Sequence, residues 1–283
     1  MKTFDLSGYR TLRTENEPGG AMENFEGKRV LVTGASSGIG AGLAVEFARR
    51  GAVVGICARR QDRLEDVLHQ CQAFSPESQM WVVDLADETA VDKLAVDFSN
   101  TFGGIDILVN NAGIPKRRHL TRLDNKTVDN VMRINYSSPV QLTLLLLPHM
   151  LAQNSGTIIN VSSVAATLSP PGEAAYSASK AAMTVFSESM ALDLWDTGIN
   201  VLILYPGVVD TELFTLPDND PMVADVEAIP VADAVAIVFD GLAQGALQVY
   251  APTWFADIAV SKAKDPQAFI AGSAEYITGR QGD

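Results

Sequence analysis

Short runs rich in β-branched residues alternate along this chain with longer segments of helical periodicity. The runs expected to form strands are residues 29–33, 52–57, 79–83, 105–109, 156–161, 199–204 and 247–250. The helix-like segments are residues 39–50, 61–72, 87–102, 124–153, 175–197 and 231–243. Helical connections let successive strands run parallel, and strands that are apolar on both faces favour a sheet covered on both sides. The sequence therefore predicts an α/β fold, a doubly wound parallel seven-stranded sheet with helices on both faces.

The expected sheet occupies most of the 283 residues as a single folded unit. No internal repeat or low-complexity linker divides the chain, and Gly and Pro fall mainly at strand-to-helix turns, apart from a loop-like patch at residues 206–230. We expect residues 1–26, which are polar and carry both charge signs, to form a flexible leader. Residues 27–251 are the predicted domain, and residues 252–283 are a C-terminal extension.

The charge of the chain excludes several classes of partner. It has 34 Asp and Glu against 21 Lys and Arg, a net charge of −13, which argues against nucleic acid or an anionic membrane as the main partner. Residues 181–261 contain 12 acidic residues and no Lys or Arg. We interpret this stretch as a substrate side that disfavours a second anion and suits a neutral, apolar molecule.

The cysteines, histidines and apolar runs predict a cytoplasmic protein without a metal site. Cys57 and Cys71 form no CxxC motif, and the three histidines lack ligand spacing. The N-terminal residues contain no apolar core for a signal peptide, and the longest apolar run, at residues 142–151, is too short to span a bilayer. We therefore expect a reduced, cytoplasmic setting and no integral membrane segment.

A glycine-rich segment, TGASSGIG at residues 33–40, follows the first predicted strand and opens the first predicted helix. Glycines let the backbone turn tightly and let a pyrophosphate approach the amide groups at the N-terminus of the helix. Because the strand and the helix supply the required context, the segment predicts a dinucleotide-binding, Rossmann-like domain.

Three further motifs follow in order: NNAG at residues 110–113, YSASK at 176–180 and YPG at 205–207. Together with the glycine-rich turn they resemble the short-chain dehydrogenase/reductase family, in its compact single-domain branch. The resemblance covers about residues 27–251 and leaves the leader and the extension outside. It implies an oxidoreductase that uses a nicotinamide cofactor.

Tyr176 and Lys180 are four residues apart and share one face of a helix. An ammonium near a phenol favours the phenolate, so we expect Lys180 to lower the pKa of Tyr176 toward neutral pH. The resemblance implies two more catalytic residues, Ser163 to bond the substrate carbonyl and Asn135 to support a water-mediated proton path to the lysine. The adjacent Ser162 is interpreted as a polar turn residue, because strand alternation lets only one of the two serines face the cleft. The alternative for Asn135 is a polar residue that kinks its helix, and it can do both.

Cofactor choice is predicted from the end of the second strand, where Ala58-Arg59-Arg60 replaces the acidic residue that would select NAD(H). A guanidinium clamps a phosphate well, so Arg59, helped by Ser36, is expected to bind a 2′-phosphate, and NADP(H) is the expected cofactor. The alternative is that both arginines are solvated loop charges. The resemblance implies that Asp84 contacts the adenine and that Asn110 and Ala112 follow the ribose. The complete set of expected cofactor contacts is Gly34, Ser36, Ser37, Gly38, Ile39, Gly40, Arg59, Asp84, Asn111, Ala112, Gly113, Tyr176, Lys180, Pro206, Gly207 and Thr211.

The expected activity is NADP(H)-dependent reduction of a carbonyl, or oxidation of the secondary alcohol, in a neutral lipophilic small molecule. The loop at residues 208–230 supplies an apolar pocket wall from Leu213, Phe214, Leu216, Met222 and Val223. Two alternatives stay open: a 3-oxoacyl-acyl-carrier-protein reductase, although residues 136–154 and 181–195 offer an acidic carrier no Lys or Arg, and a non-catalytic NADPH-binding regulator. The resemblance also implies a homodimer or homotetramer.

Overall fold

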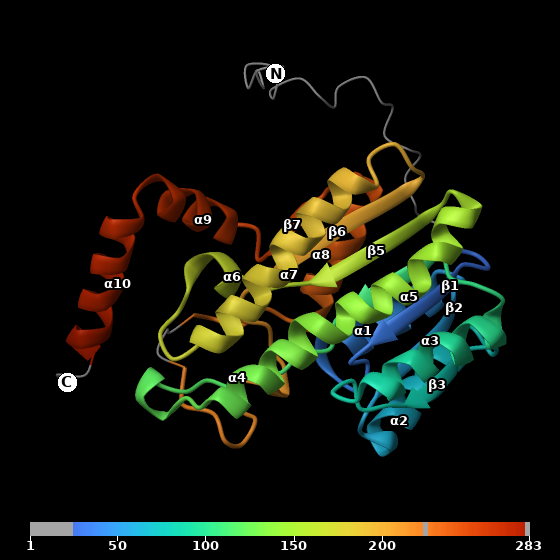
Figure 1. Cartoon of the computed structure of the whole chain (residues 1–283), viewed down its shortest axis with the longest axis horizontal. Helices are drawn as coiled ribbons and strands as arrows, with labels where there is room; N and C mark the ends of the chain where they lie inside the picture. The colour runs from blue at the N-terminus through green and yellow to red at the C-terminus, as the bar shows by residue number, and fades with distance from the viewer. Residues whose placement is uncertain (1–24, 223–225, 281–283) are drawn as a thin grey trace.

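The computed structural model describes residues 25–222 and 226–280, which form one seven-stranded sheet (Figure 1). The strands are β1 (Arg29–Thr33), β2 (Val53–Ala58), β3 (Gln79–Val82), β4 (Ile107–Asn110), β5 (Gly156–Val161), β6 (Ile199–Pro206) and β7 (Gln248–Ala251). Their order is β3-β2-β1-β4-β5-β6-β7, and every neighbouring pair is parallel. The predicted Rossmann-like sheet is confirmed, with strand bounds that shift by one or two residues.

Two helical layers cover the sheet. Helices α1 (Gly38–Arg49), α2 (Gln61–Gln72) and α8 (Val231–Ala243) pack on one face, and α3 (Glu88–Phe102), α5 (Ser138–Gln153) and α7 (Ala174–Asp193) pack on the other. Successive residues of a strand therefore enter different cores: Val30 and Val32 contact the first layer, and Leu31 contacts the second. This two-sided burial is why the strands are apolar throughout.

The segment predicted as one helix at residues 124–153 is interrupted. It consists of α4 (Asn125–Met132), a π-helical turn η3 (Arg133–Ser137) and α5. Asn135 lies inside the π-helical turn and is buried. Such turns inside helices are rare and are frequent at functional sites, because the extra residue redirects a side chain. The helix is therefore irregular at Asn135.

The two ends of the described chain differ from the expected domain limits. Phe25 is fully buried and packs edge-on against Phe47 and Phe239, with ring centroids 5.1 and 5.5 Å away. The core thus includes Phe25, a residue of the expected leader, and residues 1–24 lie outside the described part. Beyond β7 the chain forms α9 (Phe255–Lys264) and α10 (Pro266–Arg280), and Figure 1 shows α10 leading away from the sheet. In the described ranges, no helix has the length and apolar character needed to span a membrane.

A crevice forms where the direction of winding changes. Strand β1 lies between β2 and β4, and the helices that follow β1 and β4 pack on opposite faces. In open parallel sheets, ligands bind at this switch point beyond the carboxyl ends of the strands. All four sequence motifs reach this edge of the sheet.

Candidate active site

The glycine-rich turn lies directly against the end of β4. Gly34 has a φ of +65°, and a Cβ atom placed on it would lie 2.7 Å from the Cα atom of Ala112. Only glycine combines this backbone conformation with so close an approach. The contact holds the turn at the N-terminus of α1 and leaves its outer side open to the crevice.

The two asparagines of the NNAG motif have structural roles that the sequence did not indicate. The Asn111 side-chain amide donates to the carbonyl oxygens of Thr33 at 2.9 Å and Gly34 at 3.2 Å, so it holds the glycine-rich turn in place. Asn110, expected along the ribose, is buried and donates to Thr143 Oγ1 and Asn160 Oδ1 at 3.0 and 2.8 Å. Its side chain belongs to the core between β4, β5 and α5.

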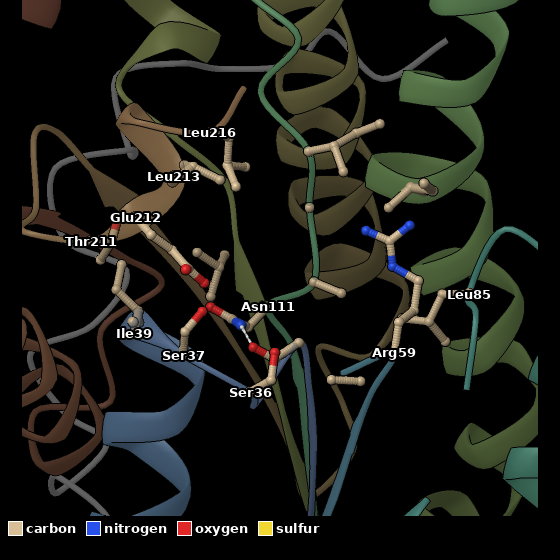
Figure 2. Close-up of a pocket in the computed structure, with 18 of the residues that line it drawn as sticks. Ser36, Ser37, Ile39, Arg59, Leu85, Asn111, Thr211, Glu212, Leu213 and Leu216 are labelled. Carbon is tan, nitrogen blue, oxygen red and sulfur yellow. Dashed lines mark hydrogen bonds between the residues drawn. The ribbon is translucent and has the colours of Figure 1, made fainter. Parts of the chain in front are cut away.

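A cavity of about 340 Å³ occupies the crevice (Figure 2). Small-molecule sites commonly have volumes of about 300–1,000 Å³. The expected cofactor residues on its wall are Gly34, Ser36, Ser37, Gly38, Ile39, Arg59, Asp84, Asn111, Ala112, Gly113, Tyr176, Lys180, Pro206 and Thr211. Two others lie behind the wall: a Cβ on Gly40 would meet the Asn111 amide at 2.3 Å, and one on Gly207 would meet the Phe255 ring at 2.2 Å.

Tyr176 and Lys180 lie on α7, and both side chains are buried. The Lys180 ammonium is 5.8 Å from the centroid of the Tyr176 ring and donates to the Val161 carbonyl at 2.7 Å. Burial lowers the pKa of Lys180 to about 8. Lys180 therefore stands beside the phenol but is anchored to β5.

The expectation of a lowered tyrosine pKa is wrong for this structure. Burial raises the pKa of Tyr176 and the negative charge of Glu173 adds to the rise, whereas the hydrogen bond with Ser163 and the charge of Arg117 oppose it. The physical reason is that an ionised phenol loses solvation in a buried position, and Lys180 directs its ammonium to a carbonyl instead.

Ser163, rather than Ser162, faces the tyrosine. Ser163 hydrogen-bonds the Tyr176 side chain and accepts from the Ala165 amide at 3.1 Å. Ser162 borders the cavity, but its hydroxyl bonds the Lys180 carbonyl at 3.1 Å and Thr184 Oγ1 at 2.8 Å. The hydroxyl of Ser162 thus supports α7, and that of Ser163 is directed to the phenol.

Asn135 connects the π-helical turn to the loop after β4. Its Oδ1 accepts from the Ile114 amide at 2.8 Å, and its Nδ2 donates to the Ile114 carbonyl and to Ser179 Oγ, both at 3.0 Å. A Cβ built on Gly113 would lie 3.3 Å from Asn135 Oδ1 and 3.4 Å from Lys180 Nζ, so the amide and the ammonium approach the same glycine. The four expected catalytic residues are therefore brought together.

Of the two arginines that follow β2, both of which border the cavity, Arg60 rather than Arg59 contacts the serines of the glycine-rich turn. Arg59 is exposed, and Figure 2 shows its side chain beside Leu85, away from Ser36 and Ser37. Arg60 instead donates to Ser36 Oγ at 3.0 Å and to Ser37 Oγ at 2.8 Å. Because Arg60 lies at the N-cap of α2, its direction depends on how that helix begins, which the sequence alone did not indicate.

Glu212, Glu173 and Arg117 were not among the expected site residues. Glu212 borders the cavity and forms ion pairs with Arg60 and Arg63. Glu173 is at the N-cap of α7, and burial raises its pKa to about 7, while the charge of Arg117 opposes that rise. No sequence motif marks these residues; lone charged residues in loops are identified only by the partners that the fold brings to them.

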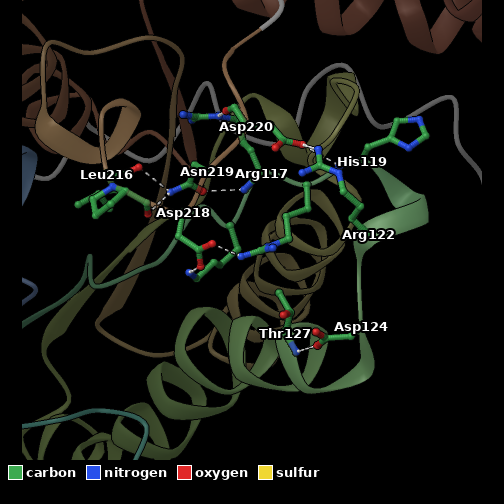
Figure 3. Close-up of polar contacts among 12 residues, drawn as sticks. Arg117, His119, Arg122, Asp124, Thr127, Leu216, Asp218, Asn219 and Asp220 are labelled. Carbon is green, nitrogen blue, oxygen red and sulfur yellow. Dashed lines mark hydrogen bonds and ion pairs between the residues drawn. The ribbon is translucent and has the colours of Figure 1, made fainter.

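Ion pairs join the loop after β4 to the loop after β6 (Figure 3). Asp218 pairs with Lys116 at 2.8 Å and with Arg118, and Asp220 pairs with Arg122. These acids belong to the acidic stretch interpreted above as an anionic substrate side. In the structure they pair with three cations from the first half of the chain, so part of the positive charge at this rim is neutralised.

The apolar wall expected from the loop at residues 208–230 is present in part. Leu213 and Leu216 border the cavity, together with Ile114. Met222 is not on the cavity wall. Val223 and the side chain of Phe214 lie outside the described part. Among the residues described, no cluster of His, Cys, Asp or Glu is arranged to hold a metal ion.

The chain is similar to known proteins over most of its length. The family model of short chain dehydrogenases matches residues 28–220. A 3-oxoacyl-[acyl-carrier-protein] reductase from Escherichia coli is 31% identical over 257 residues, covering 90% of this chain and 98% of that protein.

Solved structures agree with this similarity. A short-chain dehydrogenase from Sphingobium yanoikuyae in complex with NADPH is 25% identical with a TM-score of 0.76, over 86% of this chain and 95% of that one. One from Burkholderia phymatum in complex with NAD is 23% identical with a TM-score of 0.79, over 87% and 96%, and shows the shared fold. The chain therefore belongs to the short-chain dehydrogenase/reductase family of oxidoreductases.

Proposed function

We propose that this protein is an NADP(H)-dependent oxidoreductase that reduces the carbonyl of a neutral, lipophilic small molecule, or oxidises the corresponding secondary alcohol. The observation that carries the proposal is the meeting of Tyr176, Ser163 and Lys180 at the edge of the cavity that begins at the glycine-rich turn. A proton donor, a hydroxyl that bonds it and a buried cation are the groups that a carbonyl reduction requires.

The residues present fit a dinucleotide. The glycine-rich turn packs against Ala112 through Gly34, which has no room for a Cβ atom on that side, and its outer side borders the cavity at the N-terminus of α1. The first turn of α1 contains no acidic residue, and its N-cap Ser37 makes no capping bond within the helix, which suits a pyrophosphate. Arg59 and Arg60 border the cavity at the end of β2 and supply positive charge for a 2′-phosphate, which supports NADP(H) over NAD(H).

The bound nicotinamide would supply or accept the hydride, and the chain's own groups would handle the proton. Tyr176 donates its phenolic proton to the developing alkoxide during reduction and takes it back during oxidation. Ser163 bonds the same oxygen and stabilises its charge. The Lys180 ammonium donates to the Val161 carbonyl and would favour the phenolate only on turning toward the Tyr176 hydroxyl. Asn135 keeps the loop at Ile114 in place beside this ammonium.

The surroundings favour a neutral, apolar substrate. Leu213, Leu216 and Ile114 present aliphatic surface to the cavity. Arg118 and Arg122 at the nearby rim are paired with Asp218 and Asp220, so they are poorly suited to bind a carboxylate or phosphate of the substrate.

A 3-oxoacyl-acyl-carrier-protein reductase is the second candidate, because the E. coli enzyme of that name aligns with 90% of this chain. Docking of an acidic carrier protein needs basic surface near the site. Arg118, Arg122 and Arg133 are each engaged with an acidic residue, which makes this candidate weaker.

The test is NADPH oxidation with a panel of aliphatic and aromatic ketones and aldehydes, alongside an acyl-carrier-protein substrate. Tyr176→Phe should abolish turnover and leave NADPH binding unchanged. Tyr250→Phe is the matched control, since Tyr250 stacks on Tyr205 at 4.5 Å and is not on the cavity wall. Full activity of Tyr176→Phe would refute the mechanism, and NADPH binding without turnover of any carbonyl would favour a regulator.

We also propose that the protein acts in the cytoplasm as a homodimer or homotetramer. Exposed apolar side chains on α5 and α7 support an assembly through these helices; they are Leu144, Leu145, Leu151, Val185 and Leu192. The mass in solution, measured by light scattering after gel filtration, tests the assembly: a monomer at micromolar concentration would contradict it.

A further inference from the structure

A carboxylate of this chain occupies the positively charged end of the cavity. Glu212 Oε1 lies 2.5 Å from Arg60 Nη1, and Glu212 Oε2 pairs with Arg63. Ser37 also hydrogen-bonds this carboxylate. Figure 2 shows the Glu212 side chain directed toward Ser37, across the glycine-rich turn from its own loop. Glu212 therefore contacts Arg60 and Ser37, which border the cavity, and also Arg63 on α2.

The same donors face any phosphate that enters beside the end of β2. Arg60 donates to Ser36 and Ser37, and all three border the cavity at the turn between β1 and α1. A phosphate oxygen and a carboxylate oxygen accept hydrogen bonds from a guanidinium in the same way. A 2′-phosphate and Glu212 would therefore compete for Arg60 and Arg63.

Glu212 lies in a loop that packs tightly against the turn. The neighbouring Thr211 lies so close to Gly38 that a Cβ atom built on this glycine would be 2.9 Å from Thr211 Cγ2. On the other side of Glu212, Leu213 borders the cavity. The short 3-10 turn Glu212–Phe214 begins at this contact. The close packing of this loop thus positions the Glu212 carboxylate beside Arg60 and Arg63.

We propose that Glu212 sets the preference of this protein between NADP(H) and NAD(H), by competing as an internal anion with the 2′-phosphate for Arg60 and Arg63. This inference rests on the proposed use of a nicotinamide cofactor. Binding of NADP(H) has to displace the carboxylate, whereas NAD(H) leaves the ion pairs in place. Glu212 therefore weakens NADP(H) selectively and moves the chain toward dual use of both cofactors.

The charge of the Glu212 carboxylate should be constant across the physiological pH range. Burial would raise the pKa of Glu212, but hydrogen bonds from Arg63, Ser37 and Arg60 lower it to about 2. The carboxylate is therefore ionised at every pH at which the enzyme would be assayed, so changes of pH between 6 and 9 do not release it.

The test is direct binding of NADPH and NADH to wild type and Glu212→Gln, by titration calorimetry of the full chain. Because the ion pairs are partly exposed, we expect NADPH to bind Glu212→Gln about three- to ten-fold more tightly than wild type, with little change for NADH. Adenosine 2′,5′-bisphosphate and 5′-AMP, which differ only in the 2′-phosphate, should reproduce this difference without a nicotinamide.

Asp210→Asn is the matched control. Asp210 is an exposed acid two residues earlier in the same loop, and within the described residues it forms no ion pair. Asp210→Asn removes one negative charge, as Glu212→Gln does. An equal gain in NADPH affinity in both variants would show a general charge effect and overturn the proposal. In an Arg60→Ala/Arg63→Ala background, Glu212→Gln should no longer change the NADPH-to-NADH ratio.

The outcomes separate this inference from the proposed function. An unchanged or lowered preference for NADPH in Glu212→Gln, with wild type binding NADPH normally, overturns the role of Glu212 alone. A wild-type protein that binds neither cofactor overturns the proposed function and this inference together. Circular dichroism of each variant confirms that it is folded, and Glu212→Ala repeats the comparison without the amide.

Discussion

Replacing Glu173 with glutamine should remove a pH-dependent loss of stability that burial imposes on the cofactor-free protein. Glu173 is 9% exposed at the N-cap of α7, and its carboxylate makes no capping bond. Burial raises its pKa from an ordinary value of 4.5 to about 7, and the charge of Arg117 only partly opposes this rise. The folded protein therefore holds a proton that the unfolded chain releases.

The direction and the size of this pH dependence follow from the pKa of Glu173 in the unfolded and folded states. Between pH 4.5 and 7 the native state binds more protons at this group than the unfolded state, so the free energy of unfolding falls as the pH rises. Below pH 4.5 both states are protonated and no penalty exists. Each pH unit is worth about 1.4 kcal/mol, so the loss is complete above pH 7 and amounts to about 3 kcal/mol. Glutamine keeps the shape and cannot ionise.

The assay is urea unfolding of wild type and Glu173→Gln at pH 4, 5, 6, 7 and 8. The variant should gain about 3 kcal/mol relative to wild type between pH 4 and pH 8, because all other titrating groups cancel in the difference. Glu77→Gln, at an exposed position, should show no such trend. A difference between Glu173→Gln and wild type that stays constant across this range would refute the reasoning. The same variant should lower the pKa of Tyr176, which the Glu173 charge raises.

The remaining predictions concern the buried lysine and the start of the domain. Lys180→Met should abolish carbonyl reduction yet stabilise the cofactor-free protein at pH 7 by about 1–3 kcal/mol, because burial lowers the pKa of Lys180 to about 8 and the native state resists its charge. As Lys180 loses its proton between pH 8 and 10.5, the free energy of unfolding of the wild type should rise. Urea unfolding should therefore show a smaller difference in stability between the variant and wild type at pH 10.5 than at pH 7. Phe25→Ala should cost about 3–5 kcal/mol, since its ring fills the core between Phe47 and Phe239, and a melting temperature equal to that of wild type would contradict that packing.

The sheet and the location of the site were determined by the sequence. The strands and helices are recognisable from the local periodicity of apolar residues, and parallel strands joined by helices allow only a few topologies. The motif spacings placed the glycine-rich turn, Ser163, Tyr176 and Lys180 at the carboxyl edge of the sheet, because strand ends and helix starts are local features. In the structure, Tyr176 and Lys180 border the cavity, and Ser163 bonds the tyrosine.

Only the tertiary structure decided which charged side chains reach the site. Adjacent arginines at a helix start are equivalent in sequence, yet the direction of α2 sends Arg60 to the serines and Arg59 to the opposite wall. Glu212 and Glu173 acquire their roles from loops that meet across long sequence separations. The amide of Asn135, in the π-helical turn, likewise finds its partners Ile114 and Ser179 in segments distant in sequence. Periodicity and spacing describe the backbone nearby, whereas the electrostatics of a buried site depend on burial and on partners that only the folded chain brings together.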